Sequence, residues 1–271
     1  MSSHFLVPID FTETTLNAFK FAIQLSKSND DNFTLLHIIK HEDERIVAKQ
    51  KLDQIISESS IAEDKIAGKI IVGKFLNDIG KIAESLEASL IVMGTHGSTG
   101  LQKVFGSNAM KVVSNSKTPL LIVQENSVFH AIKKIILTID LEKESIQVVK
   151  YAAKIGELFN SEICLVGGLH TDEMLKRKVD TNILLCKKHL NDHGIKYSVE
   201  LLETKNFENN LIAFCRTYQA DMLAATYYQD TFQVFSEKFV QSLSTNSLNI
   251  PLLTIDNESI SSGSQYSFLS I

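Results

Sequence analysis

The chain has 271 residues, a formal net charge of −5 and 44% hydrophobic residues, which suits one large or two small globular domains. This charge gives no reason to expect nucleic acid or an anionic membrane as partner. No apolar run approaches the ~20 residues of a membrane span, and the N-terminus lacks the zones of a signal peptide. Three widely spaced cysteines favour neither a disulfide framework nor a zinc site. We therefore expect a cytoplasmic protein without a metal centre.

The second half of the sequence repeats the first. Residues 5–10 correspond to residues 135–140 at an offset of 130, and residues 119–123 correspond to residues 251–255 at an offset of 132. The change in offset predicts that the second half gained two residues between its second and fourth strands. A repeat of this kind indicates two copies of one structural unit.

The repeat predicts two domains, at residues 1–127 and 130–256, followed by a serine-rich tail at 257–271. The polar joint at 124–128 is short and contains neither Gly nor Pro. We therefore expect the two domains to be docked against each other and not joined by a flexible tether.

Strand and helix patterns alternate along the first half. Short apolar runs, typical of strands buried on both faces, lie at 5–9, 33–39, 70–72, 89–93 and 119–123. Helical periodicity lies between them, at 12–26 (with Thr12 as N-cap), 42–59, 77–86 and 107–116. This order, repeated in the second half, predicts an α/β fold with open parallel sheets and helices on both faces. Ligands bind such sheets beyond the carboxyl ends of the strands.

Residues 94–108 form a glycine-rich segment between a predicted strand and a predicted helix. Gly94 and Gly97 would let the main chain approach a ligand closely. Residues 106–108 would present free N–H groups and a hydroxyl at a helix N-terminus, which suits a phosphate. A surface loop in front of a capped helix is the alternative. The segment is neither a Walker A loop nor a dinucleotide fingerprint.

Residues 7–10, 35–38, 91–97 and 106–107 together resemble the universal stress protein family, strand by strand in the first half and more weakly in the second. The resemblance implies two tandem five-stranded parallel sheets of order 3-2-1-4-5, the adenine-nucleotide alpha-hydrolase-like fold. ATP-binding members have nine residues between the second and third motif glycines. Eight residues separate them here, which would shift the phosphate loop relative to the following helix.

The resemblance also implies a role for each matching residue. Asp10 would accept hydrogen bonds from ribose or adenine, although a cap on the next helix is its alternative role. Pro8 would shape the end of the first strand, and the main chain of Ile38 would meet the adenine edge. Met93 and Gly94 would form the floor, and the phosphates would face Gly97, Gly106, Ser107 and Asn108. The implied cofactor is ATP, with Mg²⁺ held chiefly by phosphate oxygens.

The second half lacks the features that would hold a phosphate. Side chains replace the three motif glycines, as Thr226, Gln229 and Lys238, and two tyrosines follow Thr226. Asp140 remains, with a helix cap as its expected role. We therefore expect residues 130–256 to fold like the first half without binding ATP. Residues 167–168, both glycine, leave open a site for a different ligand.

Members of the family usually dimerise through antiparallel last strands. Residues 120–123 and 252–255 can pair in this way within one chain, which would cover two apolar edges. The resemblance therefore implies an intramolecular pseudo-dimer, with a further homodimer and an unknown protein partner left open.

The functional expectation is a non-enzymatic regulatory module of the stress response that binds ATP in its first half with little or no hydrolysis. The sequence has neither the Ser-Gly-Gly-x-Asp-Ser loop nor the His-x-Gly-His motif of related nucleotide-cleaving enzymes. A slow ATPase and a nucleotide-free scaffold or holdase are the alternatives.

Overall fold

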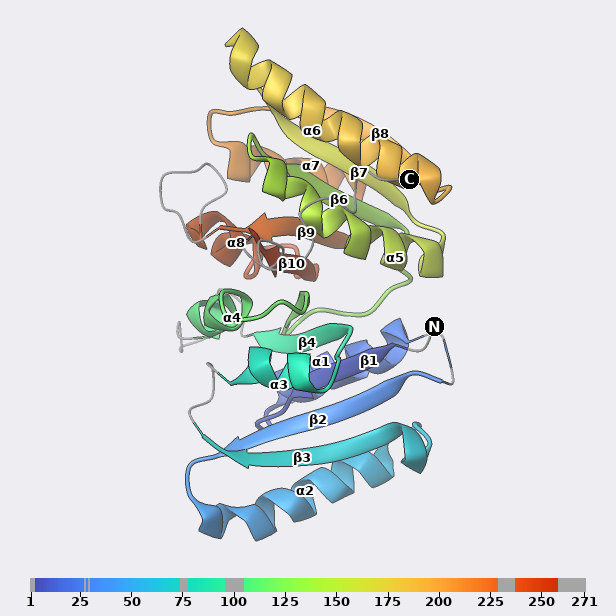
Figure 1. The fold of residues 1–271 in the computed structure, drawn as a ribbon, viewed down its shortest axis with the longest axis vertical. Coiled ribbons are helices and arrows are strands. Elements are labelled where there is room, and N and C mark those ends of the chain that lie inside the picture. The colour runs from blue at the N-terminus through green and yellow to red at the C-terminus, as the bar shows by residue number, and fades with distance from the viewer. Residues whose placement is uncertain are drawn as a thin grey trace.

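The computed structural model describes residues 3–26, 28, 30–73, 78–95, 105–228 and 237–257, with main chain alone at 105–108. Strands and helices alternate through both halves of the chain (Figure 1). None of the helices in these ranges is both long enough and apolar enough to cross a membrane.

The first half contains five strands and four helices at the predicted places. They are β1 (His4–Pro8), α1 (Glu13–Leu25), β2 (Asn32–Ile39), α2 (Arg45–Glu58), β3 (Ile66–Val72), α3 (Ile79–Ser85), β4 (Leu90–Thr95), α4 (Phe105–Val113) and β5 (Leu120–Gln124). Strand β3 begins at Ile66 and not at residue 70 as predicted. It lies at the edge of the sheet, where most of its side chains are partly or fully exposed, so its sequence lacks the continuous apolar run of a central strand.

The second half repeats these elements with one local change. They are β6 (Lys134–Ile139), η3 (Lys143–Val148), α5 (Val149–Phe159), β7 (Glu162–Leu169), α6 (Glu173–Asp192), β8 (Lys196–Glu203), α7 (Phe207–Tyr218), β9 (Met222–Tyr227), α8 (Glu237–Leu243) and β10 (Leu252–Asp256). The 3₁₀ segment η3 replaces the first turns of the helix that corresponds to α1. The two extra residues lie between β8 and β9, because β8 begins 130 residues after β3 and β9 begins 132 residues after β4.

The ten strands form one sheet in the order β3-β2-β1-β4-β5-β10-β9-β6-β7-β8. Each half has the predicted 3-2-1-4-5 order, and Figure 1 shows the strands stacked from β3 at the bottom to β8 at the top. The two predicted sheets are a single sheet because β10 pairs with β5 in antiparallel fashion, with Leu253 opposite Leu121. This pairing satisfies the two inner edges that would otherwise expose unpaired N–H and C=O groups.

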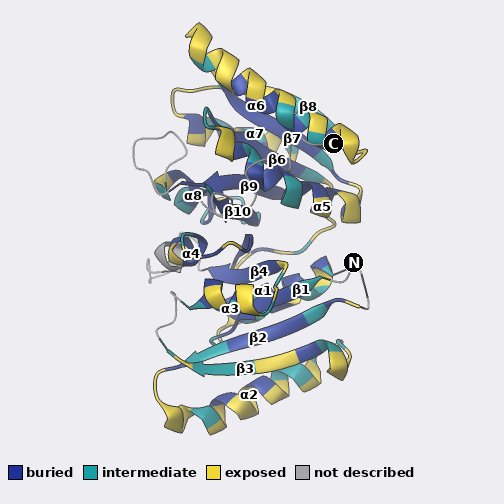
Figure 2. Cartoon of the chain, in the orientation of Figure 1, coloured by how far each residue is buried: buried dark blue, intermediate teal, exposed yellow. Residues whose placement is uncertain are grey.

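The hydrophobic core is continuous across the two halves. One cluster lies between the sheet and helices α1, α2, α5 and α6, and the other lies between the sheet and helices α3, α4, α7 and α8. Figure 2 shows the central strands buried and the outer faces of α2 and α6 exposed. Each cluster takes side chains from both halves, so the core does not divide the chain into two separate domains. The predicted boundary between residues 127 and 130 therefore stays a prediction.

The segment that joins the halves is packed against both of them. The Phe129 ring lies 4.9 Å from the Phe21 ring of α1 and 5.9 Å from the Phe159 ring of α5. The Ser127 hydroxyl donates to the carbonyl of Asn249 at 2.6 Å. Through these contacts the joining segment holds the two halves against each other, as expected for a short joint without Gly or Pro.

Removing a side chain at the contact between the halves should destabilise both of them. Leu253 is fully buried opposite Leu121, so Leu253→Ala should lower the free energy of unfolding by about 2–5 kcal/mol. Urea unfolding followed by peptide-level hydrogen exchange should show faster exchange in α1 and in α5 together. The control Val128→Ala, at a side chain that is 68% exposed, should change stability by less than about 0.5 kcal/mol. Faster exchange confined to the second half would contradict a shared core.

Candidate functional site

Asp10 lies just beyond the carboxyl end of β1, where the chain turns into α1. Its Oδ1 accepts hydrogen bonds from the Thr12 N–H at 3.0 Å, from the Thr12 hydroxyl at 2.5 Å and from the Thr15 hydroxyl at 2.8 Å. Thr12 is the N-cap residue of α1 as predicted, so Asp10, two residues earlier, holds the turn before the helix and is not itself the N-cap. Oδ2 accepts no hydrogen bond among the described residues. The turn thus orients the carboxylate and leaves one oxygen available.

The strand ladders of the two halves end at different points. The ladder between β1 and β2 ends with the pair Pro8–Leu36. The ladder between β6 and β7 continues one pair further, to Ile139–Gly167. Pro8 is the last residue of β1, one residue before the predicted end of this strand. The second half shows that the fold can accommodate a longer ladder.

The early end of the first ladder leaves the main chain of Ile38 unpaired on the β1 side. Leu36 faces β1, because its carbonyl accepts the Ile9 N–H at 2.8 Å. Ile39 faces β3, because its carbonyl accepts the Gly73 N–H at 3.2 Å. Alternation along the strand makes Ile38 face β1, and its N–H has no hydrogen bond among the described residues. The group that was expected to meet an adenine edge is thus free to do so.

Met93 and Gly94 lie in β4, beside β1 in the sheet. The Met93 side chain is 2% exposed and packs in the core cluster under α3 and α4. A Cβ on Gly94 would lie 2.5 Å from the carbonyl oxygen of Thr14, in the first turn of α1. Close packing of α1 on β4 therefore requires the glycine, a reason that the loop motif did not suggest.

Only part of the predicted phosphate segment is described. Gly97 lies outside the described residues. Gly106, Ser107 and Asn108 lie in the first turn of α4, which begins at Phe105. The early turn of a helix carries main-chain N–H groups without intrahelical partners, so these residues are where the sequence predicted free donors.

In the second half, the turn around Asp140 differs from that around Asp10. Glu142 and Ser145 replace the two threonines, and Oδ1 of Asp140 accepts one hydrogen bond, from the Leu141 N–H at 2.7 Å. Oδ2 of Asp140 and the Ser145 hydroxyl are buried without a partner among the described residues. Burial raises the pKa of Asp140 to about 6. The carboxylate that a nucleotide would contact is therefore covered by protein.

Two side chains occupy the space next to Asp140. Thr226, at the position of Gly94, is buried and its hydroxyl donates to the Ser145 carbonyl at 3.1 Å. Tyr228 is 2% exposed. Burial, chiefly, and the nearby Asp140 carboxylate raise the pKa of its phenol. Tyr228 therefore fills the space beside Asp140, in the region where the sequence predicted extra bulk. Gln229 lies outside the described residues, and Lys238 belongs to α8.

Comparison with known proteins gives the family. Residues 1–124 match the Universal stress protein family. Universal stress protein MJ0531 of Methanocaldococcus jannaschii is 29% identical over 137 residues, 44% of this chain and 81% of that protein. Universal stress protein MJ0577 of the same organism is 27% identical over 161 residues, 47% of this chain and 98% of that protein. The first half of the chain, residues 1–124, therefore belongs to the universal stress protein family.

A structural match extends beyond the half that the sequence matches cover. The crystal structure of a universal stress protein from Archaeoglobus fulgidus DSM 4304 has a TM-score of 0.73 to this chain. The match covers 95% of this chain and 99% of that one at 17% identity. It shows that the universal stress protein fold extends through both halves.

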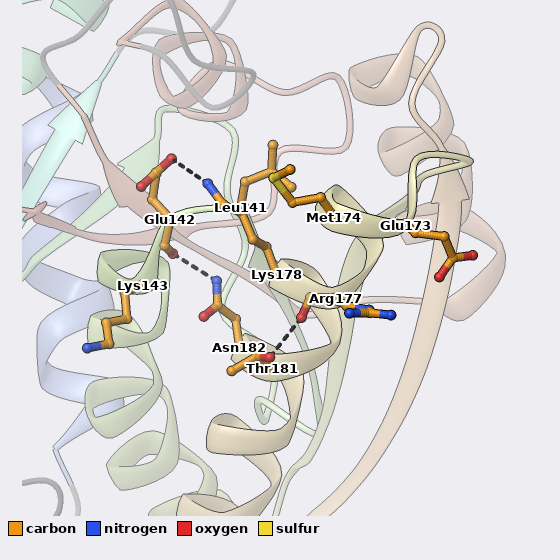
Figure 3. A pocket seen from close by; sticks show the side chains of 9 residues that line it. All are labelled: Leu141, Glu142, Lys143, Glu173, Met174, Arg177, Lys178, Thr181 and Asn182. Carbon is orange, nitrogen blue, oxygen red and sulfur yellow. Dashed lines mark hydrogen bonds and ion pairs between the residues drawn. The ribbon is translucent and has the colours of Figure 1, made fainter.

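A pocket of about 690 Å³ lies in the second half, between residues 141–143 and helix α6. The Asn182 side chain donates to the carbonyls of Asp140 and Glu142 and holds this turn against the helix. Figure 3 shows the charged ends of Lys143, Arg177 and Glu173 spread apart, so the pocket has no single charged focus.

In the first half, Phe11 occupies the position that corresponds to Leu141 of this pocket. Phe11 adopts a φ of 68°, and its ring contacts the His37 ring in a tilted arrangement with the ring centroids 4.3 Å apart. The Lys51 ammonium lies 5.1 Å from the centroid of the Phe11 ring. The sequence gave no reason to expect this arrangement, although His37 is a polar residue near the end of an otherwise apolar strand.

The two glycines over which the sequence left open a separate ligand, Gly167 and Gly168, both have a packing role. A Cβ on Gly167 would lie 2.7 Å from a methyl carbon of Val179, and a Cβ on Gly168 would lie 2.9 Å from a methyl carbon of Thr204. Helix α6 and the segment after β8 fill the space that the two glycines leave. These glycines permit close packing, and a separate ligand at this place stays a prediction.

The buried Asp140 predicts a pH-dependent stability. Because its pKa rises from 3.8 to about 6 on folding, protonation stabilises the native state fully below pH 3.8, and that stabilisation is lost as the pH rises through 6. Asp140→Asn should therefore stabilise the protein by on the order of 1–3 kcal/mol at pH 7.5 and by almost nothing at pH 4. Urea unfolding across this pH range measures the effect.

Asp10→Asn is the matched control for this prediction. Asp10 is only half-buried and its Oδ1 accepts three hydrogen bonds, so the substitution should give no gain at pH 7.5. An equal effect of Asp140→Asn at pH 4 and pH 7.5 would show that its charge is not the cause.

Proposed function

We propose that this universal stress protein is a regulatory module that binds ATP in its first half. The residues that would hold the nucleotide are Pro8, Asp10, Ile38, Met93, Gly94, Gly97, Gly106, Ser107 and Asn108. The observation that supports this proposal most strongly is the unpaired main chain of Ile38 at the carboxyl edge of the sheet, next to the oriented carboxylate of Asp10.

These groups fit the two ends of an adenosine. A free main-chain N–H can donate to an acceptor nitrogen on the purine edge, and Oδ2 of Asp10 can accept from a ribose hydroxyl or an amino group. Main-chain N–H groups in the first turn of α4 would face the phosphates. A bound Mg²⁺ would take most of its ligands from phosphate oxygens, because the described residues contain no cluster of three acidic, His or Cys side chains that could hold a metal.

We propose further that residues 130–256 bind no nucleotide. Tyr228 and Thr226 fill the corresponding space, and burial there disfavours the ionised form of Asp140 by raising its pKa. In this view the second half serves as a permanent partner for the first. The β5–β10 pairing would replace, within one chain, the contact between two separate copies, and the pseudo-dimer leaves the outer edges β3 and β8 for any further association.

The protein would act through binding and not through catalysis, in the cytoplasm, where its three buried thiols would stay reduced. ATP binding would in this way control a protein partner. A slow ATPase and a nucleotide-free scaffold are the competing functions.

Binding and turnover of labelled ATP on the full chain distinguish these functions. One ATP bound per chain, with phosphate release far slower than one per minute, is the expected result. Several turnovers per minute would favour the ATPase, and no binding in the presence of Mg²⁺ would favour the scaffold.

Gly97→Val tests where the phosphates lie. A branched side chain in the loop should obstruct main-chain contact with the phosphates and reduce ATP affinity at least about tenfold, with the fold preserved. The matched change Gln229→Val, at the equivalent position of the second half, should alter affinity less than about twofold. Calorimetric titration measures both. Equal effects of the two substitutions would contradict the assignment of the site to the first half.

A further inference from the structure

The His37 side chain lies where the first-half ladder stops. Its Nδ1 lies 2.6 Å from the carbonyl oxygen of Ile9. In a parallel ladder that carbonyl would accept the N–H of Ile38, which is the bond that is missing here. A carbonyl oxygen can only accept, so Nδ1 carries the proton and His37 is the donor.

The second half supplies a comparison within the same molecule. Glycine replaces the histidine at position 167, and there the ladder continues through the pair Ile139–Gly167. The two halves share their fold and strand order. At this point they differ in the imidazole, in Pro8 in place of Thr138 and in the positive φ of Phe11, and the imidazole alone occupies the carbonyl that the longer ladder would use. The Phe11 ring packs against the His37 ring in a tilted arrangement, with the centroids 4.3 Å apart, and holds it beside the strand end.

We propose that His37 is a positioning residue that takes the Ile9 carbonyl and thereby keeps the Ile38 N–H free for a ligand. This inference rests on the proposed function and adds a base specificity to it. A main-chain N–H at this place selects a purine whose facing ring nitrogen is unprotonated. Adenine meets this requirement at N1, whereas hypoxanthine and guanine carry a proton there.

The first test measures the Ile38 amide without any nucleotide. His37→Ala removes the donor, so the Ile38 N–H should pair with the Ile9 carbonyl and exchange with solvent about tenfold more slowly. His37→Asn restores a donor close to the position of Nδ1, so its exchange rate should stay within about threefold of the wild type. Heteronuclear NMR of the full chain labelled at isoleucine gives these rates.

An Ile38 amide that is already protected in the wild type would overturn the proposal. So would equal rates in the wild type and His37→Ala. A merely structural role for His37 predicts faster exchange in the alanine variant, because local stability would fall, and that result also contradicts the proposal.

The second test compares ATP with ITP, which differs at the purine edge. The wild type and His37→Asn should both prefer ATP. His37→Ala should bind ATP about tenfold more weakly, with an ATP-to-ITP affinity ratio close to one, because the new ladder bond must first be broken, and a tenfold change corresponds to about 1.4 kcal/mol. An unchanged ratio in the alanine variant would overturn the specificity role. If the wild type binds neither nucleotide, the proposed function fails, whereas the exchange rates still decide whether His37 frees the amide.

Discussion

The antiparallel contact between β5 and β10 governs how the two halves of this protein are related. It joins two five-stranded units into one ten-stranded sheet and merges their cores on both faces. Since β5 and β10 run in opposite directions, the carboxyl ends of the two sets of strands lie at opposite edges of the sheet. The carboxyl edge of one half can therefore change without disturbing the carboxyl edge of the other half. The two core clusters, in contrast, each take side chains from both halves.

This separation explains how a duplicated fold can differ so much at its two edges. In the first half, hydroxyls and an N–H satisfy one oxygen of Asp10, and the strand ladder ends early. In the second half, Asp140 retains one short-range hydrogen bond beneath Tyr228, and the ladder runs one pair further. A buried carboxylate without a counter-charge is costly. At the carboxyl edge of the second half, side chains therefore pack over Asp140. Burial there raises the pKa of its carboxyl group to about 6.

The glycines illustrate why a residue type alone does not reveal its role. Gly94 and Gly167 both avoid clashes with a neighbouring helix, at distances of 2.5 Å and 2.7 Å for an added Cβ. The sequence suggested ligand access for each of them. At Gly94 the packing role and a ligand role are compatible, because α1 contacts one side of the strand and the carboxyl edge remains. At Gly167 the helix fills the space.

The strand order, the pairing of the last strands and the place of Asp10 could be predicted from the repeat, the apolar periodicity and the family resemblance. The start of β3 could not, because an edge strand shows no continuous apolar run. The replacement of a helical turn by η3 and the bond from His37 to Ile9 also could not, because they depend on side-chain geometry between segments distant in sequence. His37 gave one signal, a polar residue near the carboxyl end of a buried strand, which the motif analysis did not use.

The most direct test of the account is a crystal structure of the full chain grown with ATP and Mg²⁺. The account predicts one nucleotide per chain, with its base against the Ile38 main chain, its ribose near Asp10 and its phosphates toward the first turn of α4. Nucleotide density over Asp140 and Thr226, with the edge at Asp10 empty, would contradict it.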